Sequence, residues 1–534
     1  MNLEPVPAWG TIPRMLRSQA AAHPDVLAVV AGDVRLSLAA LASRATEVAR
    51  ALIALGVGPG DRVAVWGPND PDWVVAAYGI WDVGAIIAPV STRFRGLEAA
   101  GLLRKVGASV LLAAEGFMGT SYLDMIADAD LPELRHRVVL GAGPAPSGAM
   151  SWEDFLVGGE KTSTAEAEER ASAVGLDDIA SIMATSGTTG APKGVMLHHS
   201  QLLRGYWDWA EIVTLREGDR YPVIAPFSHG FGINAGLLAC VLRRATMMPI
   251  ALFDPAGLLD LIEENRVSVL AGAPPMFFKI LDELDGRDVS SLRVLICGAA
   301  AVPPELIRRL VDRVGIERMI NAYGLMEGTV VSMTRPEDPV EVVAGSTGRA
   351  VPGVSVRVVD DDGGDLAPGE PGEILVGGYG VMRGYWNDPE RTAEAVDAEG
   401  WLHTGDIGVV DDAGNVSIVD RKKEMFIVSG FNAYPAEIEG LLLACPDVAQ
   451  VAVIGVPDDG QGEVGWAYVV PPPGRDADPD TLPDAVIAWA RENMSNYKVP
   501  RRVIPVDSLP VNANGKIDKP ALHERAASER AGAG

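Results

Sequence analysis

The segment Thr185–Gly194, which reads TSGTTGAPKG, is the most informative stretch of this chain. It lies between two short apolar runs, Ile182–Ala184 and Val195–Leu197, so we expect a loop between two strands. Its three glycines allow backbone N–H groups to converge, and its four hydroxyls and one lysine add hydrogen-bond donors. The segment differs from a Walker A loop, because Pro192 precedes Lys193 and glycine follows it. The pattern predicts a loop that binds a polyphosphate, and the alternative is a polar surface turn.

Length and charge limit the classes of protein to consider. A chain of 534 residues predicts two to four structural units, and its 48% hydrophobic and 22% charged content is typical of globular proteins. The net charge of −27 argues against a general nucleic-acid binder, because a phosphate backbone requires a basic face. For the same reason a polyphosphate site must be locally cationic or assisted by a metal.

The cysteines and the N-terminal residues indicate the cellular compartment of the protein. Cys240, Cys297 and Cys445 stand in apolar surroundings without a metal-binding spacing, which predicts buried thiols in a reducing compartment. Residues Met1–Pro5 lack the basic and apolar regions of a secretion signal, and no apolar run is long enough to span a bilayer. We therefore expect a cytoplasmic protein with no integral membrane segment.

The region before the phosphate loop alternates between helical and extended patterns. Helices are predicted at Ser37–Leu55 and Asp70–Val83, and buried strands at Arg62–Trp66 and Ile86–Val90. Such alternation indicates parallel strands with helices on both faces. The polar segment Glu160–Glu169 is expected to be a loop insertion.

Two later segments have the composition of a ligand site. A predicted strand, Leu292–Ile296, runs into the small residues Cys297–Ala301, and ligands bind at the carboxyl edge of parallel strands. The segment Asn321–Gly328 reads NAYGLMEG, in which Tyr323 offers an aromatic face for adenine and Glu327 a hard oxygen ligand suited to Mg²⁺.

The final third has a different pattern. Short segments bounded by Gly, Pro and Asp between Ser346 and Val419 predict an antiparallel, barrel-like subdomain. Beyond it, strands at Val448–Val456 and Trp466–Val470, a helix from Pro483 and a strand at Arg502–Val506 predict a compact α+β unit. The tail from about residue 526 is expected to be disordered.

Taken together, the motifs and their order resemble those of the adenylate-forming superfamily, which comprises acyl-CoA synthetases, nonribosomal adenylation domains and luciferases. The set is most similar to that of actinobacterial-type fatty-acyl and steroid-side-chain CoA ligases. Besides the phosphate loop and NAYGLMEG, it includes PFSHGFG at Pro226–Gly232, GWLHTGD at Gly400–Asp406, DRKK at Asp420–Lys423, SGFN at Ser429–Asn432 and NGK at Asn514–Lys516.

This resemblance implies an α/β fold with two domains. A large N-terminal domain, residues 1–421, would contain two stacked, mostly parallel sheets with flanking helices and a small antiparallel barrel. A small mobile α+β domain, residues 422–534, would rotate about a hinge near Lys423.

The resemblance also implies a reaction. An ATP-dependent acyl-CoA ligase activates a carboxylic acid as acyl-AMP and releases pyrophosphate, and the CoA thiol then takes the acyl group and releases AMP. The implied cofactors and co-substrates are ATP, Mg²⁺ and CoA. Neither nucleic acid nor a membrane is an implied partner, and a homodimer is left open.

Site residues follow from the motifs. Catalytic roles fall on Lys516, Glu327, His229 and Thr188, with Glu327 also the metal ligand. Nucleotide and CoA binding falls on Thr185, Ser186, Gly187, Thr189, Gly190, Lys193, Gly298, Ala299, Ala300, Asn321, Ala322, Tyr323, Gly324, Asp406, Arg421, Lys423 and Gly430. The acyl pocket is assigned to His229, Phe231, Gly232, Gly298, Met326 and Gly328.

One residue departs from the family pattern. Met326 stands where the family has a threonine, whose hydroxyl meets the α-phosphate. Loss of that donor would cost roughly 1–3 kcal/mol of transition-state stabilisation. This departure leaves open a ligand-binding homologue that has lost the chemistry. A separate alternative, which concerns the acceptor, is an enzyme that loads a carrier-protein thiol instead of CoA. The acid is left open between medium-chain, aryl and steroid-derived classes.

Overall fold

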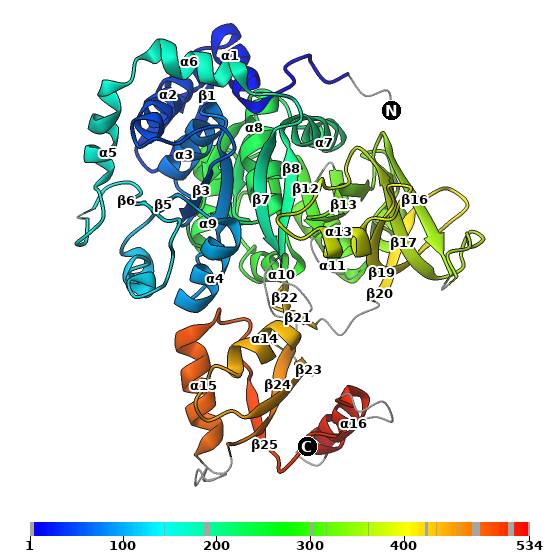
Figure 1. Ribbon diagram of the computed structural model, residues 1–534. Coiled ribbons are helices and arrows are strands. Elements are labelled where there is room, and N and C mark those ends of the chain that lie inside the picture. Colours follow the sequence, from blue (N-terminus) through cyan, green and yellow to red (C-terminus); the bar gives the residue numbers. More distant parts are fainter. Residues whose placement is uncertain are drawn as a thin grey trace. The chain divides into compact units, whose positions relative to one another are not determined.

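The computed structural model describes residues 5–143, 145–185, 193–298, 302, 304–316, 318–360, 362–421, 426–433, 435–458, 460–472, 481–510 and 517–531. The chain divides into two compact units (Figure 1). The first comprises Met1–Thr92, Leu103–Ala184 and Gly194–Asp420. The second comprises Arg93–Leu102, Thr185–Lys193 and Arg421–Gly534.

A seven-stranded sheet forms the centre of the first unit, in the order β18-β8-β7-β4-β3-β5-β6. Strands β3 to β6 pair in parallel, β4 and β7 are also parallel, and β18 is added antiparallel to β8. The strands are β3 (Arg62–Trp66), β4 (Ile86–Val90), β5 (Val110–Ala113), β6 (His136–Val139), β7 (Ile179–Thr185), β8 (Lys193–His198) and β18 (Gly384–Tyr385).

Two further sheets in this unit also have parallel centres. The five-stranded sheet contains β11 (Val269–Gly272), β12 (Val294–Gly298), β13 (Arg318–Leu325), β14 (Thr329–Met333) and β15 (Arg349–Ala350). The four-stranded sheet has the order β2-β1-β10-β9 and contains β1 (Leu27–Ala31), β2 (Val34–Ser37), β9 (Arg220–Val223) and β10 (Thr246–Pro249). The α/β class is confirmed, but the second of these sheets goes beyond the two that the sequence predicts.

An antiparallel sheet forms a curled half-barrel, as expected between Ser346 and Val419. Its order is β16-β17-β19-β20, and its strands are β16 (Val354–Val359), β17 (Gly372–Gly378), β19 (Leu402–Val410) and β20 (Val416–Arg421). The pairs β16–β17 and β17–β19 are antiparallel.

Helices cover the sheets and begin at recognisable caps. Helix α3 begins after Asp70, whose side chain accepts a hydrogen bond from Asp72 N. All of its residues except Asp72 are buried, and it packs against α2 (Figure 1). The helices are α1 (Ile12–Ala22), α2 (Leu38–Ala54), α3 (Pro71–Asp82), α4 (Gly96–Val106), α5 (Trp152–Gly158), α6 (Thr164–Ala173), α7 (His199–Ile212), α8 (Ala239–Arg243), α9 (Pro255–Asn265), α10 (Pro274–Asp282), α11 (Pro304–Val314), α12 (Val340–Gly345) and α13 (Pro389–Ala395).

The second unit contains a sheet of β21 (Phe426–Val428), β22 (Phe431–Ala433), β23 (Gln450–Asp458), β24 (Gly462–Val470) and β25 (Arg502–Pro505). Its helices are α14 (Pro435–Leu442), α15 (Leu482–Asn493) and α16 (Lys519–Ala531). Helix α16 continues past residue 526, where the sequence predicts disorder, and Ala526 is buried.

Two local expectations have clear outcomes. The three cysteines are buried, as predicted, and burial raises the pKa of Cys240 and Cys297. The segment Glu160–Glu169 was expected to be a loop, but it enters helix α6, where Ser163 accepts a hydrogen bond from Glu166 N.

Within the part of the chain that the structure describes, none of the helices has both the length and the apolar character needed to span a bilayer.

A buried histidine predicts a pH-dependent stability. His199 Nδ1 accepts a hydrogen bond of 3.4 Å from Ile12 N, and burial lowers the pKa of His199 to about 3. Between that value and the ordinary 6.5 the unfolded chain binds a proton that the folded chain does not, so stability falls as pH falls. At pH 5 the free energy of unfolding is lower by about 2 kcal/mol for this reason.

We expect the His199→Asn variant, which keeps an acceptor, to escape this loss. Its free energy of unfolding relative to wild type should improve by about 2 kcal/mol between pH 7.5 and pH 5, measured by urea denaturation. The raised pKa of Asp82 is common to both proteins and cancels in this difference. An equal difference at the two pH values would show that His199 is not held neutral.

Candidate active site

The carboxyl ends of β12 and β13 bring several predicted residues together. Gly298 is paired with Ala322 in a parallel register, and a Cβ at Gly298 would lie 2.7 Å from the Ala322 carbonyl oxygen. Only glycine allows this approach, so the small residue is required by the sheet itself. The edge lies directly before Tyr323, as expected of a ligand site in a parallel sheet.

Tyr323 and Asp406 meet although 83 residues separate them. The Tyr323 hydroxyl donates a hydrogen bond of 2.5 Å to Asp406 Oδ2, and Asp406 is only 3% exposed. The Asp406 backbone N–H in turn donates to Thr404 Oγ1. An aromatic face beside a fixed carboxylate suits a nucleoside, because a carboxylate can accept hydrogen bonds from both hydroxyls of a ribose.

Glu327 lies in the turn between β13 and β14, close to β18. The Tyr385 hydroxyl donates to Glu327 Oε1 at 3.0 Å, and Met382 N donates to the Glu327 carbonyl at 2.7 Å. In the described part of the chain, no group of three or more His, Cys, Asp or Glu side chains could hold a metal alone. A single oriented carboxylate fits Mg²⁺, which is commonly held by one or two carboxylates together with substrate phosphates.

Four of the predicted acyl-pocket residues lie at the start of a π-helix, η4 (Phe231–Leu238): His229, Phe231, Gly232 and Met326. Gly230 precedes it, and a Cβ there would lie 2.8 Å from Met326 Sδ. Phe231 contacts Trp209 edge to face, with ring centroids 6.3 Å apart. His229 has an exposed surface, but the protein packed around its ring lowers its pKa. Such π-helical turns are frequent at functional sites.

Sequence reasoning missed a buried polar pair next to this segment. Asn234 is 2% exposed, and its side chain forms a hydrogen bond with Tyr206, whose pKa burial raises to about 12. Asn234 lies inside η4, and a single asparagine in this apolar segment gives no sequence signal of a site. Tyr206 is 5% exposed and belongs to the hydrophobic core of the first unit.

Several predicted site residues have structural roles in this unit. The Asn321 amide donates to the carbonyls of Val343 and Ser346, and a Cβ at Gly232 would collide with the carbonyls of Ala225 and Pro226. A Cβ at Gly324 would collide with the Thr329 carbonyl, and one at Gly328 would lie 2.8 Å from Leu325. Backbone packing is therefore sufficient to require Gly232 and Gly324, whereas the neighbours of Gly328 are leucine side chains.

The remaining predicted residues are not tested by this geometry. Thr185, Lys193, Arg421 and Gly430 belong to the second unit, where Gly430 has φ +84° in the turn between β21 and β22. Outside the described residues lie Ser186, Gly187, Thr188, Thr189, Gly190, Ala299, Ala300, Lys423 and Lys516.

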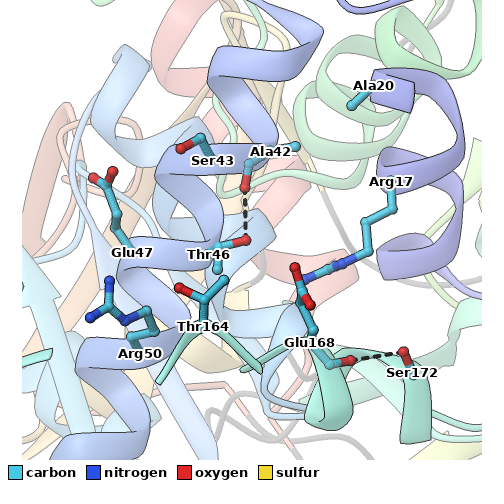
Figure 2. Close-up of a pocket in the computed structure, with 10 residues that line it drawn as sticks. All are labelled: Arg17, Ala20, Ala42, Ser43, Thr46, Glu47, Arg50, Thr164, Glu168 and Ser172. Atoms are coloured by element: carbon cyan, nitrogen blue, oxygen red, sulfur yellow. Dashed lines mark hydrogen bonds between the residues drawn. The ribbon is translucent and has the colours of Figure 1, made fainter. Parts of the chain in front are cut away.

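A hollow elsewhere in the first unit is distinct from this site. Figure 2 shows the side chains of α1, α2 and α6 that line it. Its volume is about 560 Å³. Arg17 on its wall is paired with Asp82 at 2.6 Å, and no predicted site residue lines it. It therefore does not contribute to the candidate active site.

The contact between Gly230 and Met326 predicts a specificity effect. We expect Gly230→Ala to displace the Met326 thioether and raise the KM for the acid about tenfold, the scale of one methyl group in an apolar pocket. The Gly230→Ala/Met326→Thr variant removes the sulfur and should recover most of that loss. Steady-state kinetics of wild type, Gly230→Ala, Met326→Thr and the double variant would reveal it, and additive effects of the two substitutions would contradict the contact.

Comparisons with known proteins agree with this geometry. The chain matches the AMP-binding enzyme family over residues 16–386 and the AMP-binding enzyme C-terminal domain over residues 437–516. A relative from Rhodococcus jostii, 3-[(3aS,4S,7aS)-7a-methyl-1,5-dioxo-octahydro-1H-inden-4-yl]propanoyl:CoA ligase, is 44% identical over 520 residues, covering 96% of this chain and 98% of its own. A ligase of the same name from Mycobacterium tuberculosis is 44% identical with the same coverage.

A solved structure is similar over the whole length. The fatty acyl CoA synthetase of Mycobacterium tuberculosis superposes with a TM-score of 0.70 at 31% identity, covering 97% of this chain and 99% of that one. The first family match includes the phosphate loop, PFSHGFG and NAYGLMEG, and the second includes NGK, whereas GWLHTGD, DRKK and SGFN lie between the two matched ranges. The chain therefore belongs to the AMP-binding enzyme family of adenylate-forming ligases.

Proposed function

We propose that the acid used by this acyl-CoA ligase is a bulky alicyclic propanoate and that the reaction requires Mg²⁺. The protein is an AMP-forming acid–thiol ligase that uses ATP and CoA, as its family membership and its relatives indicate. The carboxylate attacks the α-phosphorus of ATP, giving acyl-AMP and pyrophosphate. The CoA thiol then loses its proton and displaces AMP from the acyl carbon, giving the thioester.

The observation that carries the substrate proposal is the identity of 44% to two ligases named for a propanoyl group on a fused bicyclic diketone. The described wall of the site is compatible with such an acid. It contains the apolar Phe231 and Met326 together with the buried polar pair Asn234 and Tyr206. A site with a few placed polar groups in an apolar wall is typical of small-molecule recognition.

The nucleoside is assigned to the contact between Tyr323 and Asp406. The Tyr323 ring offers a face for adenine, and the buried Asp406 carboxylate offers acceptors for the ribose hydroxyls. The triphosphate is assigned to the loop Thr185–Lys193, whose Thr188 and Lys193 would supply donors. When bound, Mg²⁺ would neutralise phosphate charge, and Glu327 would hold it.

Roles in both steps are assigned to the C-terminal domain, which we place at residues 422–534. Lys516 serves adenylation, and Gly430 serves passage of the pantetheine arm, since a side chain in a narrow tunnel would obstruct it. Arg421 would contact the nucleotide and Lys423 would act as the hinge. The three buried cysteines, which have no metal-binding spacing, support a reducing, cytoplasmic location.

A comparison of acids tests the substrate class. Purified enzyme with ATP, Mg²⁺ and CoA would be offered a bicyclic propanoate, a cinnamate-type aryl acid and octanoate, and acyl-CoA would be quantified by mass spectrometry. We expect the highest kcat/KM for the bicyclic acid. A preference of tenfold or more for either of the others would contradict the proposal. Formation of acyl-AMP without acyl-CoA would instead favour a carrier-protein thiol as acceptor.

A further inference from the structure

Tyr385 is a buried tyrosine to which the sequence analysis assigns no function, and its hydroxyl contacts the Glu327 carboxylate. Its side chain is 5% exposed, and its hydroxyl is 3.0 Å from Glu327 Oε1. A glutamate carboxylate ends a flexible side chain, so a fixed hydroxyl on one oxygen restricts where the carboxylate points.

The backbone that carries Tyr385 is fixed to the strand that follows the phosphate loop. Tyr385 pairs with Val195 of β8, and Trp386 N donates to the Gly194 carbonyl at 2.7 Å. A Cβ at Gly194 would lie 3.3 Å from Trp386 Cβ, so the two backbones approach closely. The position of the Tyr385 hydroxyl is therefore set by the first residues after the loop.

The other side of Tyr385 is held as well. Its backbone N–H donates to Thr392 Oγ1 at 2.9 Å, and that hydroxyl donates to the Asp388 carbonyl at 2.7 Å, at the start of α13. The same connecting segment also holds Glu327 by its main chain, through Met382 N. One rigid segment thus contacts both the backbone and the carboxylate of Glu327.

We propose that Tyr385 is a positioning residue that orients the Glu327 carboxylate for the metal–nucleotide complex and couples it to the strand leaving the phosphate loop. This inference rests on the proposed role of Glu327 as the metal ligand. Hydrogen-bond partners of metal ligands tune affinity, and their removal commonly costs 10–100-fold in metal affinity or activity. Tyr385→Phe keeps the ring that fills the space and removes only the hydroxyl.

The test is a double-mutant cycle read by binding as well as by rate. Wild type, Tyr385→Phe, Glu327→Gln and the double variant would be titrated with Mg²⁺ at fixed ATP, following the ligand-induced rise in Tm and, separately, pyrophosphate release. Tyr379→Phe is the matched control, because its hydroxyl, on the same connection, contacts Asp208 at 3.3 Å. The Tm without ligand reports any damage to the fold.

We expect Tyr385→Phe to raise the Mg²⁺ concentration for half-maximal stabilisation about tenfold or more. The substitution should add little in the Glu327→Gln background, and Tyr379→Phe should titrate as wild type. A wild-type titration for Tyr385→Phe, or an equal shift in both backgrounds, overturns the positioning role alone. An unchanged Mg²⁺ requirement in Glu327→Gln overturns the proposed metal role of Glu327, and the positioning role with it.

Discussion

Replacing Lys498 by methionine is expected to destabilise the second unit by about 3–5 kcal/mol. Lys498 Nζ lies 2.7 Å from Glu98 Oε1 and 2.6 Å from Glu437 Oε1, and the side chains are 1%, 3% and 7% exposed. All three residues belong to this unit, which includes Arg93–Leu102. Burial alone would lower the pKa of Lys498, but the acidic side chains of Tyr497, Glu437 and Glu98 outweigh it and raise the pKa.

The physical reason is that the variant leaves two carboxylates buried without their cation. Desolvated charges cost several kcal/mol each unless they are paired, so loss of one partner is worse than loss of the whole cluster. The triple variant Lys498→Met/Glu98→Gln/Glu437→Gln should therefore be more stable than Lys498→Met. Hydrogen exchange in peptides from β23 and β24, followed by mass spectrometry, measures the opening free energy of this unit directly.

A surface pair in the same unit serves as the control. Arg525 Nε lies 3.1 Å from Glu529 Oε1, with side chains 49% and 25% exposed, so Arg525→Met should cost less than about 1 kcal/mol. If the amide hydrogens of β23 and β24 exchanged as slowly in the Lys498→Met variant as in the Arg525→Met variant, the buried cluster would not stabilise the unit.

Replacing Lys516 by alanine is expected to lower acid-dependent pyrophosphate release by about 10²–10³-fold or more. A cation delivered to the carboxylate and the α-phosphate stabilises negative charge as it develops, and alanine removes it. The transfer of the acyl group to CoA does not use this lysine. Formation of acyl-CoA from a supplied acyl adenylate should therefore remain near the wild-type rate.

Lys519→Ala is the matched control, because it removes the same charge three residues away, where Lys519 Nζ lies 3.1 Å from Glu439 Oε1. It should leave both half-reactions within a few-fold of wild type. Equal losses of both steps in Lys516→Ala would show that the lysine is not specific to adenylation. A large loss in Lys519→Ala would assign the effect to the structure of this segment.

The sequence predicted the α/β fold because hydrophobic periodicity and loop composition are local properties. Helix α3 follows its Asp-Pro start closely, and the paired short segments of the half-barrel have the expected turn residues. The same reasoning failed at Glu160–Glu169, because a polar helix buries only Ala167 and Ala171 and has little apolar periodicity. The extra four-stranded sheet depends on pairing β1 with β10 across most of the unit, which no local pattern specifies.

The candidate site was predictable only where a motif identified both partners. Tyr323 and Asp406 were each singled out, and their hydrogen bond follows from tertiary structure that brings β13 to β19. Tyr385 and Asn234 were not, because a buried tyrosine and a buried asparagine have no distinguishing sequence context. Their importance depends on the side chain opposite, Glu327 in one case and Tyr206 in the other.

The central claim, ligation through an acyl adenylate, is tested most directly by exchange of labelled pyrophosphate into ATP without CoA. We expect exchange that requires both the acid and Mg²⁺, followed on addition of CoA by one AMP and one acyl-CoA for each pyrophosphate released. Formation of ADP and phosphate would contradict the adenylate route. Binding of ATP without exchange for any acid would contradict catalysis itself and leave a ligand-binding protein.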